Sequence, residues 1–362
     1  MQQEVQQNKQ RANKEKDFMP NSPTIHATNI YAPNDMTNLG IVQSEKAAEF
    51  SQFGIELDIP GTQPAIKDYF APLLPWEICA VQAQTSNGKT TFTNWWIRKI
   101  AEQLARQKRD ETIIWVSLEE TIEAMAYSEF GRVLKVKPAD IARGTYSDRK
   151  KLLWAKMQID GINIWRIGNS SQTPDDAPPL TLSNIYRSTR ELIDGGVTGD
   201  KFKPAVMVVD YLQILPIDPE FAKAQQKDQR RLQVDADTGR LRNMTSRLQC
   251  PIIVPLQAKQ ELTGNNPPYM IPGVYDGMET SGIATRFDRI LSLWMPKQTY
   301  PVGTTHYNKD KTQSVTCTGD NQAFLKVNKQ RGGLPAGMVW ELKIDFGEQE
   351  YMDAFYNPKV TK

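Results

Sequence analysis

The sequence predicts an α/β fold in which helices cover both faces of a mostly parallel sheet. Two observations support this prediction. From residue 60 onward, short apolar, β-prone segments alternate with segments in which apolar residues have helical spacing. The first β-prone segment runs into a turn that ends in Gly-Lys-Thr-Thr at 88–91, and a helix-like segment follows. Strands that are separated by helices build parallel sheets, because the helix returns the chain to the start of the next strand.

Eight segments are predicted to be strands, with helix-like segments between the early ones. The clearest helix spans residues 182–193, with Thr181 or Ser183 as its N-cap. The last strands have no helices between them, so we expect them to extend one edge of the sheet in antiparallel orientation. The predicted strands span residues 78–82, 112–117, 162–167, 206–210, 252–256, 290–294, 324–327 and 339–344.

The N-terminal residues differ in composition from the rest of the chain. Residues 1–35 are rich in Gln, Asn, Lys and Pro and contain few apolar residues, so we expect them to be disordered or to order on a partner. A short helix is predicted over 44–53. We therefore divide the chain into an N-terminal arm with a linker helix (1–55), one α/β domain (56–350) and a C-terminal tail (351–362).

Composition limits the classes of function. The 44 basic and 42 acidic residues leave a net charge of +2, which neither requires nor excludes a nucleic-acid partner. Cys79, Cys250 and Cys317 lie far apart, as expected for buried thiols in a reducing compartment. His26 and His306 fall in polar, loop-like stretches and match no zinc site or catalytic triad. No apolar run approaches the roughly 18 residues of a membrane span, so we expect a cytoplasmic protein without a membrane partner.

The segment AQTSNGKTT at 83–91 has the layout of a phosphate-binding loop, in which backbone N–H groups and a helix N-terminus point at a phosphate. Lys89 would reach the β- and γ-phosphates, and the Thr90 hydroxyl would bind Mg²⁺. Ala83 stands where the strict motif has its first glycine; an ordinary strand–turn–helix with a surface lysine is the alternative. The predicted nucleotide-binding residues are Ala83, Ser86, Asn87, Gly88, Lys89, Thr90 and Thr91.

Acidic residues follow two predicted strands. Asp210 ends the apolar run VMVVD, where a carboxylate can lie beside Mg²⁺; an acid that only caps a buried strand is the alternative. The run IIWVSLEE at 113–120 places Glu119, with Glu120 as the second choice, where a carboxylate could activate the water that attacks the γ-phosphate. This requires the strand to lie near the phosphate loop. Otherwise the two glutamates are only solvated.

Two further segments carry candidate side chains. Gln257 ends the apolar run 252–257, where an uncharged amide could sense the γ-phosphate. In KQRGG at 329–333, Lys329 and Arg331 share one face if the segment is extended. They could stabilise the charge that develops on a γ-phosphate, either within the chain or across a subunit interface. The alternative is a surface hairpin whose cations only provide solubility.

Taken in order, these segments resemble the C-terminal motor domain of bacterial replicative DNA helicases (DnaB-like, superfamily 4), a RecA-like P-loop NTPase. AQTSNGKTTF is similar to that family's A-R-P-S-M-G-K-T-[ST]-F, in which the first glycine is commonly alanine. VSLEE is similar to F-S-L-E-M, VVDYLQIL to I-D-Y-L-Q-L-M and NKQRGG to G-K-Q-R-N-G. The resemblance covers about residues 55–350.

The resemblance implies a role for each candidate residue, with ATP and Mg²⁺ as cofactors. Glu119 would be the catalytic base and Asp210 the Mg²⁺-associated acid. Gln257 would be the sensor, and Lys329 and Arg331 would reach into the ATP site of the neighbouring subunit. The segment DGMETSGIATRFDRIL at 276–291 is also similar to a stretch of the family, but its residue 286 is an arginine where the family usually has an acid.

The resemblance further implies a homo-hexameric ring that threads single-stranded DNA. The loops 216–232 and 258–280 would face its channel, although their cations could equally belong to a solvated surface. The family's primase-binding N-terminal domain has no counterpart in the polar first 55 residues, so we expect a plasmid or phage protein that works with a replication initiator or loader. The predicted DNA-binding residues are Lys223, Lys227, Arg230, Arg231 and Lys259.

Three functions remain open from the sequence. The first is an ATP-dependent helicase that moves 5′ to 3′ on single-stranded DNA and unwinds duplex during replication. The second is a RecA-like recombination, repair or loader ATPase that assembles on DNA without unwinding it. The third is a nucleotide-gated scaffold without catalysis. A closed hexamer without DNA favours the first, and a filament that forms only on DNA favours the second.

Overall fold

The computed structural model divides the chain into two compact units, Met1–Gly54 and Ile55–Lys362. In the first unit residues 36–42 are helical, and of the predicted helix at 44–53 only residues 44, 45 and 48 are described, all of them helical. For residues 226–231 and 282–283 the structure describes the backbone alone. The described residues are 36–42, 44–45, 48, 54–210, 214–216, 226–258, 271–277, 282–298, 300–307, 314–331, 336–345 and 349–354.

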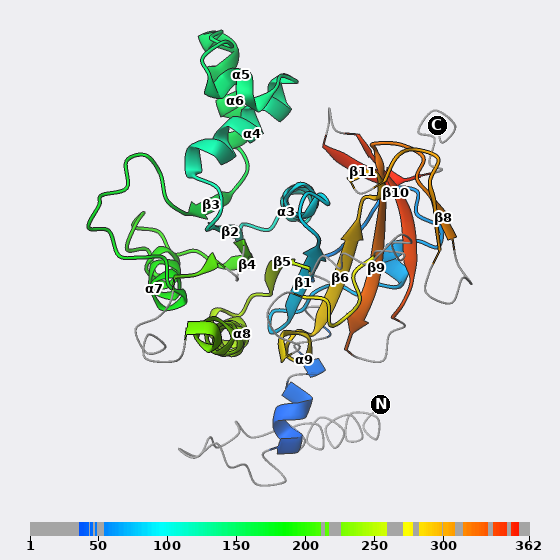
Figure 1. Ribbon diagram of the computed structural model, residues 1–362. Helices are drawn as coiled ribbons and strands as arrows, with labels where there is room; N and C mark the ends of the chain where they lie inside the picture. Colours follow the sequence, from blue (N-terminus) through cyan, green and yellow to red (C-terminus); the bar gives the residue numbers. More distant parts are fainter. Residues whose placement is uncertain are drawn as a thin grey trace, which may run out of the picture. The chain divides into compact units, whose positions relative to one another are not determined.

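The second unit is built on a nine-stranded sheet with the order β11-β10-β9-β6-β1-β5-β4-β2-β3 (Figure 1). The strands β1 to β6 run parallel, and β9, β10 and β11 extend one edge in antiparallel orientation, so the predicted fold class is confirmed. The strands are β1 Ile78–Ala83, β2 Thr112–Ser117, β3 Ile164–Ile167, β4 Pro204–Asp210, β5 Ile252–Gln257, β6 Arg289–Trp294, β9 Gln322–Gln330, β10 Val339–Asp345 and β11 Glu350–Asp353.

Helix α3 covers one face of this sheet, and α7 and α8 cover the other (Figure 1). Two short strands, β7 Thr305–Tyr307 and β8 Ser314–Thr316, form a separate hairpin. The α-helices are α3 Lys89–Arg106, α4 Ile122–Leu134, α5 Pro138–Ala142, α6 Arg149–Asp160, α7 Leu182–Ile193, α8 Gln226–Leu248 and α9 Gly282–Arg286, and the short 3₁₀ helices are η1 Ile66–Asp68 and η4 Pro296–Gln298.

The apolar runs of the central strands are continuous because both faces of the sheet are buried. In β1, Cys79 and Val81 belong to the hydrophobic cluster that contains Trp96 of α3. Their neighbours Ile78 and Ala80 belong to the cluster that contains the buried side of α8. Successive residues of a strand point to opposite faces, so one short apolar segment supports both layers of helices.

Helix α7 has the predicted bounds, and Thr181 is its N-cap: the Thr181 hydroxyl accepts a hydrogen bond from the backbone N–H of Asn184 at 3.4 Å. The cysteines are buried, as predicted. His306 is a correction, because it lies in β7 and is buried, with its ring 3.6 Å from that of Tyr300 between centroids. No helix in the described part of the chain is long and apolar enough to cross a membrane.

The predicted C-terminal tail begins too early. Strand β11 occupies residues 350–353 and pairs with β10. The Tyr351 side chain is fully buried, with ring centroids 5.3 Å from Phe92 and 5.5 Å from Trp95 of α3. This strand could not be predicted from local patterns, because it has four residues and its partners in the core are about 250 positions away.

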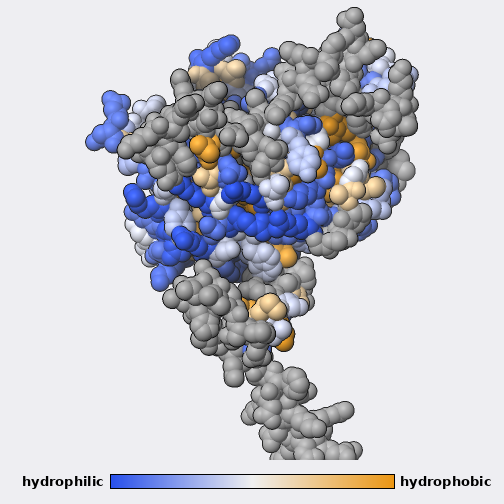
Figure 2. Space-filling view, turned by 60° about the horizontal axis from the view of Figure 1, so that its bottom comes forward, coloured by the Kyte–Doolittle hydropathy of each residue, from blue (hydrophilic) through white to orange (hydrophobic). Residues whose placement is uncertain are grey.

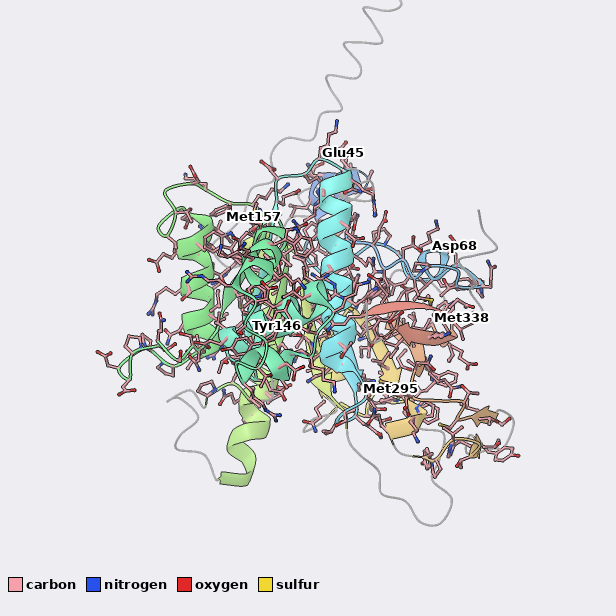
Figure 3. The ribbon with its side chains drawn as sticks, turned by 90° about the horizontal axis from the view of Figure 1, so that it is seen from above. Glu45, Asp68, Tyr146, Met157, Met295 and Met338 are labelled. Atoms are coloured by element: carbon pink, nitrogen blue, oxygen red, sulfur yellow. The ribbon has the colours of Figure 1, made fainter. Side chains whose placement is uncertain are left out.

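Between β2 and β3 the chain forms a helical insertion, α4 to α6, that stands away from the sheet (Figure 1). Seen from above, Tyr146 and Met157 mark this insertion, at a distance from Met295 at the end of β6 (Figure 3). Helix α6 buries Ala155 alone and exposes Leu153, Trp154 and Met157. The insertion therefore adds helices beside the sheet without contributing much to its core.

Candidate nucleotide-binding site

The turn that joins β1 to α3 lies at the C-terminal edge of the parallel strands. Gly88 precedes α3 with φ +77°, in the left-handed region. This backbone conformation favours glycine, and a Cβ atom here would also lie 2.8 Å from the Met295 sulfur, so that side chain would have to shift. The turn thus presents the N-terminus of α3 at an open edge of the sheet, which is the geometry of a phosphate-binding loop.

Asn87 fixes this loop to the sheet. Its Oδ1 accepts a hydrogen bond from the backbone N–H of Met295 at 2.8 Å, and its Nδ2 donates to the Thr85 carbonyl at 3.1 Å. The side chain is buried and does not line the adjoining cavity. Of the nucleotide-binding residues predicted from the sequence, Asn87 is therefore the exception: its side chain shapes the loop instead of facing a ligand.

A cavity of about 290 Å³ opens over the loop. It contains the other predicted loop residues and also Glu119 and Gln257, which come from the ends of β2 and β5. Met295 and Gln298, at the end of β6 and in η4, also line it, and no sequence motif pointed to them. The lining residues are Ala83, Gln84, Thr85, Ser86, Gly88, Lys89, Thr90, Thr91, Glu119, Gln257, Met295 and Gln298.

Asp210 ends β4 beside the loop, with its Oδ1 3.8 Å from the Lys89 Nζ. The carboxyl is buried, and Oδ1 has no hydrogen-bond partner among the described residues. Burial raises the pKa of Asp210 to about 7; Lys89 lowers it, while Glu119 and Glu120 raise it further. A buried carboxylate with an oxygen that lacks a hydrogen-bond partner, beside the lysine of the phosphate loop, fits a divalent cation.

Glu119 reaches the cavity although its strand is not adjacent to β1, since β5 and β4 lie between them. From the sequence, the role of Glu119 depended on its strand lying near the phosphate loop. The two strands do not pair, but Glu119 still lines the cavity, because the parallel strands β1 and β2 end on the same side of the sheet. Glu120 does not line the cavity; its backbone N–H and carbonyl are both hydrogen-bonded to the Ser117 hydroxyl, at 3.2 and 2.7 Å.

Replacing Glu119 with Gln is expected to leave ATP binding intact and to lower turnover by about 10²-fold, because an amide cannot accept a proton from water. Phosphate release and titration with a fluorescent ATP analogue measure the two effects separately. Glu120→Gln is the matched control and should turn over normally. Retained turnover in Glu119→Gln together with loss in Glu120→Gln would assign the base to Glu120.

Gln257 links the end of β5 to the loop. Its Nε2 donates a hydrogen bond to the Thr85 hydroxyl at 2.5 Å. Parallel pairing places it level with Ala83, the last residue of β1. The Gln257 side chain contacts the loop, and its backbone leads into the segment that follows β5. A change in what the loop binds could therefore be passed to that segment.

Lys329 and Arg331 do not join this cavity. Strand β9 is antiparallel to β6, so Lys329 is level with Ile290, which in turn is level with Ala80 near the start of β1. Arg331 lies beyond the strand, and its backbone N–H donates to the Asp288 carbonyl. With about 3.3 Å per strand residue, the five residues from Ile78 to Ala83 separate Arg331 from the loop by roughly 17 Å.

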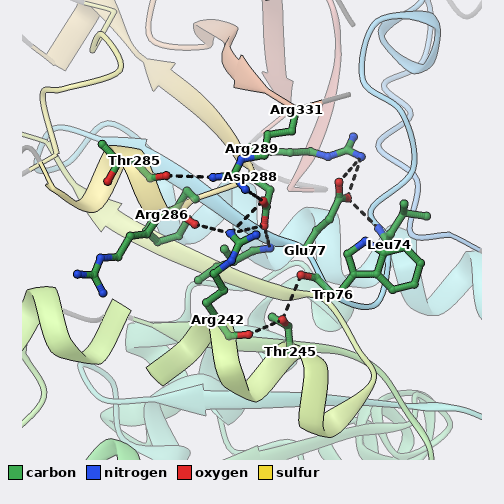
Figure 4. A network of polar contacts seen from close by, with 12 residues as sticks. Leu74, Trp76, Glu77, Arg242, Thr245, Thr285, Arg286, Asp288, Arg289 and Arg331 are labelled. Atoms are coloured by element: carbon green, nitrogen blue, oxygen red, sulfur yellow. Dashed lines mark hydrogen bonds and ion pairs between the residues drawn. The ribbon is translucent and has the colours of Figure 1, made fainter. Parts of the chain in front are cut away.

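At the opposite ends of the parallel strands, both cations contact α9 and the two residues that follow it. The Lys329 Nζ donates hydrogen bonds to the carbonyls of Ala284 and Phe287, each at 2.7 Å. Arg331 forms an ion pair with Asp288 at 3.0 Å and donates to the Thr285 carbonyl at 3.2 Å (Figure 4). Burial and the neighbouring Arg331 lower the pKa of Lys329.

The structure also explains the arginine at position 286. Its Nη2 lies 2.8 Å from Asp235 Oδ2 on α8, so the two helices are joined by an ion pair. A Cβ atom at Gly239 would lie 2.5 Å from Arg286 Nη1, which shows that the guanidinium packs directly over this glycine. A basic residue at 286 is matched by an acid and a glycine on α8.

The predicted DNA-binding residues lie at the margin of what the structure describes. Lys223 and Lys259 fall outside the described residues. Lys227, Arg230 and Arg231 lie in the first two turns of α8, of which the backbone alone is described. The face of the molecule that carries α8 and α9 is mostly hydrophilic where it can be seen (Figure 2).

A loop at a helix N-terminus, at the C-terminal edge of a parallel sheet and beside a lysine and a buried acid, is typical of α/β proteins that bind nucleoside triphosphates. Over residues 65–350 the chain matches the model of the DnaB-like helicase C-terminal domain. It therefore belongs to the family of DnaB-like helicase C-terminal domains.

Two solved structures share this fold. The ATPase domain of G40P has a TM-score of 0.61 and 18% sequence identity, and the match covers 87% of this chain and 98% of that chain. A DnaB-like replicative helicase, described with its interactions with primase, has a TM-score of 0.59 and 17% identity; 87% of this chain and 66% of that chain are covered. A search of curated proteins gives no match.

Proposed function

We propose that this protein is an ATP-driven ring helicase that moves on single-stranded DNA and unwinds duplex during replication. One observation carries the proposal. The cavity over the phosphate loop lies at the C-terminal ends of the parallel strands, and the cations Lys329 and Arg331 lie at the opposite ends of these strands. In a chain of the DnaB-like family, this arrangement lets one subunit offer its cations to the ATP of the next.

Within the cavity each side chain has a distinct task. Lys89 would neutralise the β- and γ-phosphates, and the loop N–H groups would hold them. Thr90 and Asp210 would bind Mg²⁺, which supplies positive charge to the phosphate oxygens. Glu119 would orient the attacking water and accept its proton. Gln257, joined to Thr85, would report the loss of the γ-phosphate to the segment that follows β5.

The distance between the two edges supports action between subunits. Arg331 cannot reach the loop of its own chain, roughly 17 Å away along the strands. A head-to-tail interface would bring it to the neighbour's γ-phosphate, and repeating such an interface around a rotation axis closes a ring. We propose a hexamer on the basis of family membership.

The DNA would be held by the loops 216–232 and 258–280. Changing Lys223, Lys227 and Arg230 together to Ala is expected to weaken binding of single-stranded DNA and to flatten its salt dependence. Three lost phosphate contacts should reduce the slope of log K against log[salt] by about 2. Fluorescence anisotropy at several salt concentrations measures this slope.

The matched control removes three exposed cations from α6, Lys150, Lys151 and Lys156, which lie on the helical insertion. This control should keep the wild-type slope. An unchanged slope in the loop variant, or an equal change in the control, would exclude the loop from the DNA path.

Strand displacement on a forked DNA duplex tests the proposed function directly. Unwinding that requires ATP, and that disappears in Arg331→Ala, is the expected result. DNA-stimulated ATP hydrolysis without unwinding by the wild type would instead favour the second candidate, a recombination, repair or loader ATPase. Absence of both activities, with ATP binding retained, would leave a nucleotide-gated scaffold.

A further inference from the structure

Asp288 is the centre of a polar cluster at the N-terminal ends of the parallel strands, opposite the nucleotide cavity (Figure 4). The residue is 3% exposed. Its carboxylate accepts a hydrogen bond from the backbone N–H of Ile78 at 3.0 Å. Its backbone is tied as well, since its N–H donates to the Ile78 carbonyl and its carbonyl accepts from the Arg331 N–H. The carboxylate is thus fixed to the first residue of β1.

Two arginines share this carboxylate. Arg242 Nη1 of α8 lies 3.0 Å from Asp288 Oδ1, and Arg331 Nη1 also lies 3.0 Å from Oδ1. One negative charge therefore holds two positive charges, so the cluster keeps a net positive charge that faces outward. The side chain of Arg331 is 49% exposed, although two of its nitrogens are occupied by Asp288 and Thr285.

A guanidinium has five N–H donors, so Arg331 keeps donors that can bind a phosphate while Asp288 holds it. The contacts with Asp288 and Thr285 restrict the torsions of the Arg331 side chain, which would otherwise sample many rotamers. Positioning a charged group before the reaction lowers the cost of bringing it to the transition state.

Arg242 connects this cluster to the helix that begins in the proposed DNA loop. Its Nη1 donates to the Arg286 carbonyl at 2.8 Å as well as to Asp288. Arg242 follows the start of α8 at Gln226 by 16 residues, or about 24 Å of continuous helix. The ion pair between Asp235 and Arg286 adds a second link from α8 to the same segment.

We propose that Asp288 positions Arg331 for the nucleotide of the neighbouring subunit, and that Arg242 couples this position to the DNA-bearing end of α8. The inference rests on the proposed function, because it requires Arg331 to act in trans. A shift of α8 when DNA binds would be transmitted through Arg242 to the carboxylate that holds Arg331. Asp288 and Arg242 are positioning residues and touch no nucleotide themselves.

Asp288→Asn tests the positioning role. The amide oxygen can still accept from the Ile78 N–H, but the charge that holds the guanidinium is lost. We expect ATP turnover in the presence of DNA to fall by about 10- to 100-fold, with nucleotide affinity unchanged. In an Arg331→Ala background the same substitution should have no further effect on turnover, because a positioning residue has nothing left to position. Multiplicative losses in the double variant would overturn the proposal.

Arg242→Gln tests the coupling to DNA without changing the carboxylate, and it serves as the second variant if Asp288→Asn does not fold. The expected result is a DNA stimulation of turnover that is reduced about 10-fold. Arg240→Ala is the matched control: Arg240 lies on the same helix and pairs with Asp237 at 3.2 Å, away from Asp288. Full DNA stimulation in Arg242→Gln would overturn the coupling.

These outcomes separate the inference from the function on which it rests. Near-normal turnover in Arg331→Ala would show that Arg331 does not act on the neighbouring subunit's nucleotide. Asp288 would then have no reacting group to position. Impaired turnover in Arg331→Ala with normal turnover in Asp288→Asn would reject the positioning role and leave the proposed helicase intact. Thermal melting of each variant confirms that the compared proteins are folded.

Discussion

Replacing Lys89 with Ala is expected to abolish ATP hydrolysis and to weaken nucleotide binding severely. Lys89 begins α3 and lines the cavity over the phosphate loop, with its ammonium group 3.8 Å from Asp210. Two groups therefore depend on it: the β- and γ-phosphates of the ligand, and the buried carboxylate, whose charged form Lys89 favours. Phosphate release and isothermal titration with ATP measure the two losses.

Lys99→Ala is the matched control. Lys99 lies on the same helix, ten residues later, and pairs with Glu102 and Glu350 at 3.3 and 3.1 Å. Both substitutions remove one cation from α3, but this one lies outside the cavity lining and should leave turnover near the wild-type level. Hydrolysis that survives in Lys89→Ala would mean that the loop does not bind the transferred phosphate.

Replacing Arg331 with Ala is expected to lower ATP turnover by about 10³-fold while leaving nucleotide affinity nearly unchanged. The affinity should persist because the cavity that holds the nucleotide lies at the other edge of the sheet. The turnover should fall because the guanidinium would act on charge that develops only during the reaction. Steady-state hydrolysis and analogue titration, both at saturating DNA, measure this difference.

Lys343→Ala is a suitable control, because it removes an exposed cation from β10, in the same antiparallel extension. Arg331→Lys should remain impaired, since lysine cannot hold Asp288 and a phosphate with one planar group. A turnover close to that of the wild type in Arg331→Ala would end the role of Arg331 as a trans-acting residue.

Much of the fold could be predicted because local patterns carry it. The runs at 112–117 and 206–210 are apolar and β-prone, since parallel strands are buried on both faces, and both became strands at or near the predicted bounds. Helix α7 has the predicted bounds, because its buried residues repeat with helical spacing after a threonine cap. The family motifs placed Glu119, Asp210 and Gln257 at one edge, where the structure also has them.

Other features depend on contacts that sequence spacing does not reveal. The role of Asn87 follows from its hydrogen bond to Met295, 208 positions away. Position 286 looked anomalous because its partners, Asp235 and Gly239, lie on another helix. The Asp288 cluster likewise joins residues from β1, α8 and the end of β9, so no local motif contains it.

The placement of the phosphate loop and Arg331 at opposite edges of one sheet has an arithmetic consequence. If each catalytic centre takes its loop from one subunit and its arginine from the next, a lone subunit has none. An open row of n subunits then has n − 1 centres, whereas a closed ring has n. Activity per subunit would grow with the length of the row, and the final contact that closes the ring would add a centre without adding a subunit.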